Sequence, residues 1–173
     1  MKNSLLLLLL ILVSSCAKDH VMPAANLSYV SIEREDQSFL YDIHYKSDIN
    51  FLDLFGKGES EGVASAILEC ALGDDQDISV ERFRQLSAYG VIEADQVKTD
   101  GQSYRYVTSA FFKRTIKNGT GDDDLSIKEI NSILLNKSSI PCKAVLTAYG
   151  YKPYYSNVMN VPVADLLREV NKP

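Results

Sequence analysis

Apolar and polar residues alternate with a period of two along much of this chain, and this pattern limits it to folds rich in β-strands. The alternation is clearest over 39–46, where Phe39, Tyr41, Ile43 and Tyr45 alternate with Leu40, Asp42, His44 and Lys46. Successive side chains of a strand point to opposite faces, so such a segment is predicted to bury one face. The same reasoning predicts strands at 27–33, 64–72, 104–116, 140–149 and 154–161.

Other segments have helical spacing. Ser126 and Glu129 form a capping-box pattern, which predicts the start of a helix. Its apolar residues at helical spacing are Ile127, Ile130, Ile133 and Leu134. A weaker helix is expected from Ser79 to Gly90, with Val80, Phe83 and Leu86 on its inner face. A third, C-terminal helix is expected from the spacing of Val163, Leu166, Leu167 and Val170. We therefore expect an α+β domain, mainly antiparallel β and sandwich-like, with two or three short helices. A parallel βαβ crossover within 64–116 is the alternative.

Two segments of the chain resemble each other. Residues 64–80 and 108–127 each combine an expected strand, an acidic turn and the start of an expected helix. A duplication and a chance match between similar local patterns are both open, since two copies do not make a repeat architecture.

The first 16 residues have the composition of a secretory signal. Lys2 precedes an unbroken apolar run over 5–13, and Ser14, Ser15 and Cys16 follow it. This run is too short to cross the hydrocarbon core of a membrane, which takes about 20 residues of helix. The segment is therefore predicted to be a signal peptide that is removed from the mature protein.

The residues Val13-Ser14-Ser15-Cys16 closely resemble the lipobox of bacterial lipoproteins. The resemblance implies that a lipid such as palmitate joins the Cys16 thiol, that residues 1–15 are removed, and that the new N-terminus is acylated. Several acyl chains would hold the protein stably on a membrane, whereas one holds it weakly. The residue after the cysteine is Ala17, not aspartate, which resembles the enterobacterial pattern for sorting to the outer membrane. The resemblance thus implies a protein on the outer membrane that faces the periplasm. An ordinary cleaved signal without lipidation is the alternative.

The mature chain is long enough for one domain. Residues 16–26 lack periodicity, include Pro23 and are expected to form a lipidated tether that reaches at most about 30 Å. Residues 27–173 are expected to form a single globular domain with a real core. The chain has 18 basic and 23 acidic residues, and no cluster of lysine and arginine. This composition argues against nucleic acid as a partner.

The three cysteines also fit an exported protein. If Cys16 carries lipid, Cys70 and Cys142 can pair in only one way. Both lie on the apolar face of their expected strands, and exported proteins meet an oxidising environment. We therefore predict a Cys70–Cys142 disulfide, which closes a loop of roughly 70 residues and stabilises the fold by about 4 kcal/mol. Two buried free thiols are the alternative.

Patterns that might indicate catalysis or metal binding lack their required context. Residues 58–62 have the G-x-S-x-G spacing, but a strand is expected after them, and both histidines, His20 and His44, come earlier. The acidic segments 74–77 and 122–124 suggest calcium, yet the second misses three defining positions of an EF-hand loop. We expect no enzyme activity, no metal and no cofactor.

Tyrosines gather near the C-terminus, where one expected hairpin carries Tyr149, Tyr151, Tyr154 and Tyr155. Exposed tyrosines are enriched at protein interfaces and often anchor partners. These four residues are therefore candidates for partner binding. Cross-strand pairing of the rings within the hairpin is the alternative.

Together these features predict a non-enzymatic lipoprotein that binds another envelope protein as an assembly or accessory factor. An inhibitor or immunity-type lipoprotein is the alternative, in which the acidic segments occlude the basic active site of an enzyme. A hydrolase of unrecognised type is a third hypothesis, for which no nucleophile and base can be named.

Overall fold

A computed structural model describes residues 17–35, 38–55, 62–82, 84–95, 103–116 and 120–172. Cys16, the serine of the G-x-S-x-G pattern and Phe83 lie outside these ranges. The described strands are β1 (Leu27–Arg34), β2 (Leu40–Ser47), β3 (Val63–Ala71), β4 (Leu86–Val91), β5 (Glu93–Ala94), β6 (Tyr104–Thr115), β7 (Asp122–Asp124), β8 (Ser139–Ala148), β9 (Tyr154–Tyr155) and β10 (Met159–Pro162). The described helices are η1 (Phe51–Asp53), α2 (Ile127–Leu134) and α3 (Val163–Val170).

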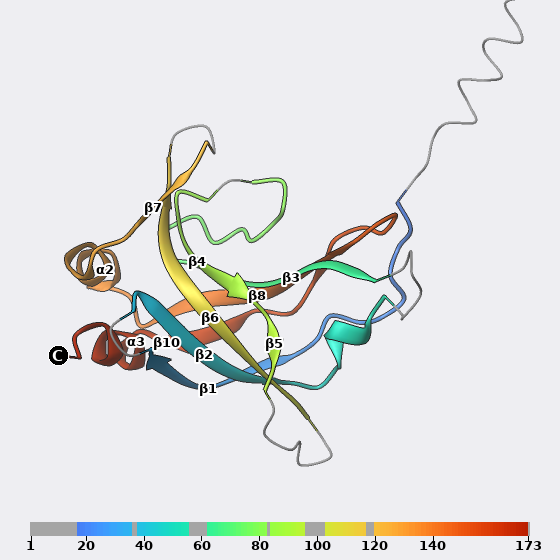
Figure 1. Ribbon diagram of the computed structural model, residues 1–173, viewed down its shortest axis with the longest axis horizontal. Helices are drawn as coiled ribbons and strands as arrows, with labels where there is room; N and C mark the ends of the chain where they lie inside the picture. Colours follow the sequence, from blue (N-terminus) through green and yellow to red (C-terminus); the bar gives the residue numbers. More distant parts are fainter. Residues whose placement is uncertain are drawn as a thin grey trace, which may run out of the picture.

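These strands form one mainly antiparallel sheet that curls into a nearly closed barrel, which confirms the expected fold class (Figure 1). The main path through the sheet is β1-β2-β6-β4-β3-β8-β10, with β5 and β7 on β6 and β9 on β8. Every strand pair in the described part of the chain is antiparallel. The parallel crossover considered for 64–116 is therefore wrong.

Helix α3 covers the seam between β1 and β10, where the barrel does not close. Tyr29 donates a hydrogen bond to Asp165 across 3.1 Å, and the Arg34 backbone N–H donates to Glu169 Oε2 across 3.3 Å. At the start of β1, the Asn157 N–H donates to the Ala25 carbonyl across 2.9 Å. The last two bonds satisfy backbone groups that an open sheet edge would leave exposed, and the first fastens α3 to β1 through side chains.

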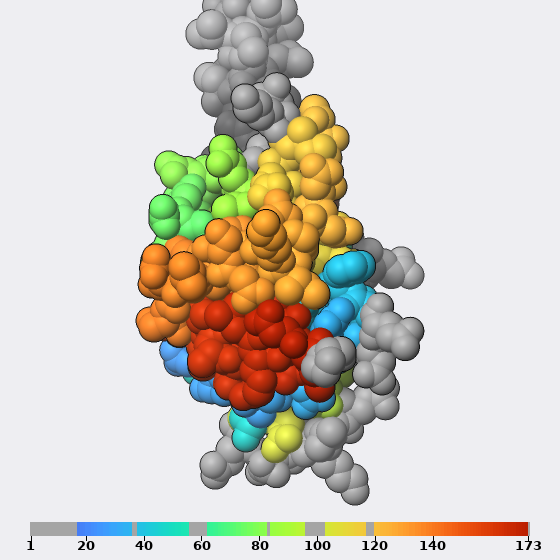
Figure 2. Space-filling view, turned by 90° about the vertical axis from the view of Figure 1, so that its left-hand side faces the viewer, coloured from blue at the N-terminus to red at the C-terminus, as the bar shows by residue number. Residues whose placement is uncertain are grey.

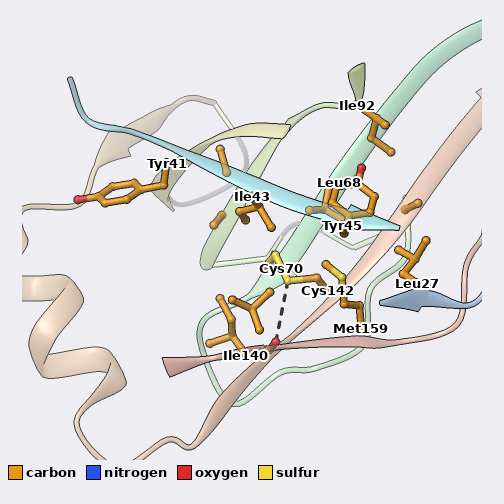
Figure 3. Packing of buried hydrophobic residues seen from close by; sticks show 14 of the residues in the cluster. Leu27, Tyr41, Ile43, Tyr45, Leu68, Cys70, Ile92, Ile140, Cys142 and Met159 are labelled. Carbon is orange, nitrogen blue, oxygen red and sulfur yellow. Dashed lines mark hydrogen bonds between the residues drawn. A yellow bond between two sulfur atoms is a disulfide. The ribbon is translucent and has the colours of Figure 1, made fainter. Parts of the chain in front are cut away.

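Three of the four residues predicted on the buried face of the strand over 39–46 fill the barrel interior, whereas Phe39 lies just before β2 and is 60% exposed. Tyr41, Ile43 and Tyr45 of β2 are buried, and the Tyr41 ring packs edge-on against Phe112 with centroids 4.9 Å apart. Phe51 of η1 fills one end of the barrel by stacking on Tyr106 at 4.2 Å. Figure 3 shows these strands contributing side chains to one continuous core around the two cysteines.

The predicted Cys70–Cys142 disulfide is confirmed. Cys70 of β3 and Cys142 of β8 are register partners on adjacent strands, with their Cα atoms 4.0 Å apart. Both residues are fully buried, and 72 positions separate them in the sequence. The bridge therefore joins distant parts of the chain inside the core.

The capping box at the start of α2 is also confirmed. The Glu129 N–H donates to Ser126 Oγ, and the Ser126 N–H donates to Glu129 Oε2 across 3.0 Å. The hydrogen bonds from Ser126, together with Arg114 at 2.8 Å, lower the pKa of the Glu129 carboxyl to about 2. Helix α3 matches the expected C-terminal helix.

The helix expected after Ser79 is wrong, because Leu86–Val91 is strand β4. Strand β4 pairs with β3 on one side and β6 on the other, and this pairing outweighs a weak helical pattern. Gly90 does not end a helix; a side chain there would collide with the Ser109 carbonyl of β6. The two similar segments thus differ in structure, since the described part of the first contains no helix.

Candidate functional site

The four tyrosines proposed for partner binding do not form one exposed face. Tyr149 is 88% exposed, at the turn after β8. Tyr151 is half-buried against Phe55, with ring centroids 5.2 Å apart. Only Tyr149 therefore has the exposure that the hypothesis requires of an anchor.

Tyr154 and Tyr155 have structural contacts instead. The buried Tyr154 hydroxyl accepts a hydrogen bond from the Ala25 N–H across 2.6 Å and donates to the Pro23 carbonyl across 2.9 Å. The Tyr155 hydroxyl accepts from the Val80 N–H across 3.1 Å and so holds the segment between β3 and β4. The Tyr154 ring belongs to the core and so lacks the exposure that the partner-binding hypothesis expects of it.

A groove lies at one end of the barrel. Its volume is about 610 Å³, and we call it the rim groove. Leu72, Leu86 and Ile133 provide its apolar surface, and Asp74, Arg84 and Lys137 its charged one. It lies between α2 and the segment that joins β3 to β4. Figure 2 looks onto this end of the molecule, where α2 (orange) lies between that segment (green) and α3 (red).

Arg84 is the most unusual residue of the rim groove because its guanidinium is almost fully buried. The side chain is 2% exposed, and its Nη1 lies 2.7 Å from Glu69 Oε1. Its Nη2 donates to the Asp77 carbonyl, whereas the buried Nε has no hydrogen-bond partner among the described residues. Burial raises the pKa of the Glu69 carboxyl, and the charge of Arg84 opposes that rise.

Lys137 forms the facing wall of the rim groove. Its ammonium donates to the Gly73 carbonyl across 3.0 Å and lies 3.3 Å from Asp74 Oδ1. Both cations of the groove are thus engaged by acceptors of β3 or of the segment that follows it. The resulting surface suits a ligand with apolar side chains and a few polar groups rather than a highly charged small anion.

A second hollow of about 400 Å³ continues from the first through Gln85 and Leu86. Arg114, Thr115, Ile116 and Asp123 complete its lining. The two acidic segments of the sequence therefore flank one surface, with Asp74 and Asp75 on the first hollow and Asp123 on the second. Such an elongated surface with an apolar floor can accept an extended segment of another protein.

The groups considered for catalysis do not converge within the described structure. The sulfurs of Cys70 and Cys142 are bonded to each other, so neither is a free nucleophile. His44 Nδ1 lies 3.9 Å from Asp95, and His20 packs on the Tyr154 ring. Within the described ranges no three histidine, cysteine or acidic side chains are grouped to hold a metal ion.

The acidic segment 122–124 forms a strand instead of a calcium loop. Lys113 lies 2.7 Å from Asp124, and Tyr89 donates to Asp122 across 2.8 Å. These contacts give two of the three carboxylates partners within the sheet, which accounts for their position without a bound ion.

Comparisons with protein-family models, with curated proteins and with solved structures find no match to this chain. Among the residues that the structure describes, no helix is both long and apolar enough to cross a membrane. The fold and site thus define a disulfide-bonded, barrel-like β-domain with a groove at one end.

Sequence reasoning missed the rim groove for two reasons. Arg84 and Leu86 belong to the segment that the sequence predicts as a helix, and a helix there would not have β3 and β6 as its neighbours. Ile133 was assigned only to the buried face of α2. The one useful signal was the pair of acidic segments, whose carboxylates lie beside both hollows.

Proposed function

We propose that this protein is a lipoprotein anchored through Cys16 in the outer membrane, facing the periplasm. There it binds another envelope protein, without catalysis, as an assembly or accessory factor. The observation that carries the proposal is the position of the rim groove. Helix α2, which borders it, lies at the opposite end of the barrel from the point where the described chain begins (blue in Figure 1). A domain anchored beside Ala17 would therefore present the groove away from the membrane.

The lipid anchor is tested by replacing Cys16. Cys16→Ala removes the only thiol that precedes the domain and should abolish palmitate labelling, leaving an uncleaved or soluble form. Labelling of wild type and variant in growing cells measures this directly. Retention of the label in the variant would contradict the proposal.

The groove as a docking surface is tested by photocrosslinking in intact cells. A photoreactive amino acid at Gln85, exposed between the two hollows, should give one protein adduct of defined mass. The same photoreactive group at Val158, which is 49% exposed outside the groove, serves as the control and should give none. Equal adducts from both positions would show that the groove is not a preferred surface.

A groove variant makes the test quantitative. Ile133→Asp should weaken binding of the partner by about 2 kcal/mol or more, which is about 30-fold in Kd, because it places a charge on the apolar floor of the groove. Leu135→Asp is the matched control, since Leu135 belongs to the same helical segment but is 75% exposed. Melting temperatures of both variants correct for any loss of folded protein.

The carboxylates beside the groove favour a second candidate function. Asp75 and Asp123 are exposed on the two hollows and could face a basic active site, as in an inhibitor or immunity-type protein. Charge-driven association slows strongly with added salt. A Gln85 adduct to a basic hydrolase, formed in low salt and lost in high salt, would favour this function over the first.

A further inference from the structure

The expected tether is attached to the domain almost from its first described residue. The Lys18 N–H donates to the Gly150 carbonyl across 2.8 Å, and the Lys152 N–H donates to the Lys18 carbonyl across 2.9 Å. The side chains add to this clamp: Lys152 Nζ lies 2.7 Å from Asp19, and Lys18 Nζ lies 5.6 Å from the centre of the Tyr151 ring. Figure 1 shows the β8–β9 hairpin reaching the point where the described chain begins.

This clamp shortens the reach of the anchor. Only Ala17 stands between Cys16 and Lys18, so the two α-carbons are at most about 7 Å apart. A free tether over residues 16–26 would instead allow about 30 Å. A lipid on Cys16 would therefore hold the end of the hairpin close to the lipid headgroups.

The chemistry of the hairpin end suits that position. Gly150 adopts a left-handed conformation with φ of 78°, which makes the turn tight and leaves Tyr149 at its outer side, 88% exposed. Tyrosine rings are enriched at membrane interfaces, where the ring contacts acyl chains and the hydroxyl contacts water and headgroups. Lys18 and Lys152 belong to the same clamp, where the Lys152 ammonium pairs with Asp19 and the Lys18 ammonium lies over the Tyr151 ring. Lysine stems can lie along apolar surface while the charge reaches the headgroups.

We propose that Tyr149, Lys18 and Lys152, which we call the hairpin tip, form a membrane-contacting surface that seats the domain on the phospholipid headgroups. The inference rests on the proposed lipidation of Cys16. The clamp to Lys18 fixes the angle between the barrel and the bilayer, and the rim groove then faces the periplasm. The exposed Tyr149 thus has a lipid partner, in place of the protein partner considered from the sequence.

The absence of tryptophan from the chain makes a direct test available. Tyr149→Trp places a single indole fluorophore at the hairpin tip, and Leu135→Trp places one on an exposed site in the helical segment at the opposite end. The lipidated proteins are reconstituted into vesicles of phosphatidylcholine and phosphatidylglycerol that contain a spin-labelled lipid quencher. We expect a blue shift and several-fold stronger quenching for the Tyr149→Trp protein, and neither for the Leu135→Trp protein.

A third variant tests the clamp itself. Lys18→Pro removes the N–H that donates to Gly150, so in a Tyr149→Trp background it should bring the quenching down towards that of the Leu135→Trp protein. Its melting temperature should stay near that of the parent, because the lost hydrogen bond holds only the exposed start of the described chain, while Tyr154 still binds the backbone at Pro23 and Ala25.

Mass spectrometry of the N-terminal peptide separates failure of this inference from failure of the proposed function. A peptide without lipid would contradict the proposed function. A lipidated, vesicle-bound Tyr149→Trp protein that is quenched no more than its Leu135→Trp counterpart would overturn the hairpin tip as a membrane surface and leave the lipoprotein proposal intact. A protein adduct from a photoreactive group at position 149, with no quenching there, would also overturn it.

Discussion

Cys70→Ala is expected to lower the free energy of unfolding by about 2–5 kcal/mol. The disulfide closes a loop between residues 72 positions apart and lies at the centre of the core, where both cysteines are fully buried. Without it, the unfolded chain gains conformational freedom, and the single remaining thiol keeps its place among apolar side chains. Denaturant unfolding of the oxidised protein and the variant measures the difference.

The partner cysteine supplies the control. Cys142→Ala should cost about as much as Cys70→Ala, and the double variant only slightly more, because each single change already removes the whole bond. Reduction of the wild type should reproduce the loss. Losses that add in the double variant, or free thiols in the denatured and unreduced wild type, would contradict a structural disulfide.

The strands and the disulfide could be predicted because both depend on local patterns. On β8, alternate residues Ile140, Cys142, Ala144 and Leu146 are all buried, as the period of two requires. Once the faces of β3 and β8 were known, the two thiols had to point into the same core. The capping box of α2 is equally local, since Ser126 and Glu129 satisfy each other within one turn.

The region from Ser79 to Val91 could not be predicted because long-range pairing decides its structure. Leu86, Ala88 and Gly90 have the spacing of a strand, whereas Val80, Phe83 and Leu86 have that of a helix, and the choice depends on β6 lying alongside. Tyr154 illustrates the same limit. Its surroundings in the sequence indicate a tyrosine-rich hairpin, but its burial depends on Pro23 and Ala25, more than a hundred positions away.

The rim groove depends on three such long-range arrangements at once. It needs β4 beside β3, the segment between them folded back over Glu69, and α2 packed across the barrel end. The pairing of β4 with β3 alone puts a strand where the sequence predicts part of the helix that Ser79 opens. A groove whose walls come from segments around 74, 84 and 137 leaves no contiguous pattern in the sequence.

Arg84→Met is expected to lower the free energy of unfolding by about 3 kcal/mol at neutral pH. The variant keeps an apolar stem in place of the arginine but leaves the Glu69 carboxylate without its cation, on a side chain that is 17% exposed. Removing one partner of a buried ion pair usually costs more than replacing both, because an uncompensated charge remains. Glu69→Gln/Arg84→Met is therefore the control, and it should recover part of the loss.

The pH dependence of this loss follows from the sign of the Glu69 shift. Burial raises the pKa of Glu69 in the folded protein above its ordinary value of 4.5, and without Arg84 the pKa rises further. The folded variant then binds a proton more tightly than the unfolded chain does. The contribution of Glu69 to stability is therefore highest below its ordinary pKa and falls as the pH rises through the folded pKa.

The difference in free energy of unfolding between Arg84→Met and wild type should therefore be small in acid and grow as the pH rises above 4.5. Denaturant midpoints measured at several pH values give this curve, and the deficit of the double variant should not grow with pH, because it carries no carboxylate at position 69. A deficit of the same size at every pH would mean that the loss comes from the packing of the arginine stem. In that case Arg84 would support the rim groove by its shape, and the charge of Glu69 would contribute little.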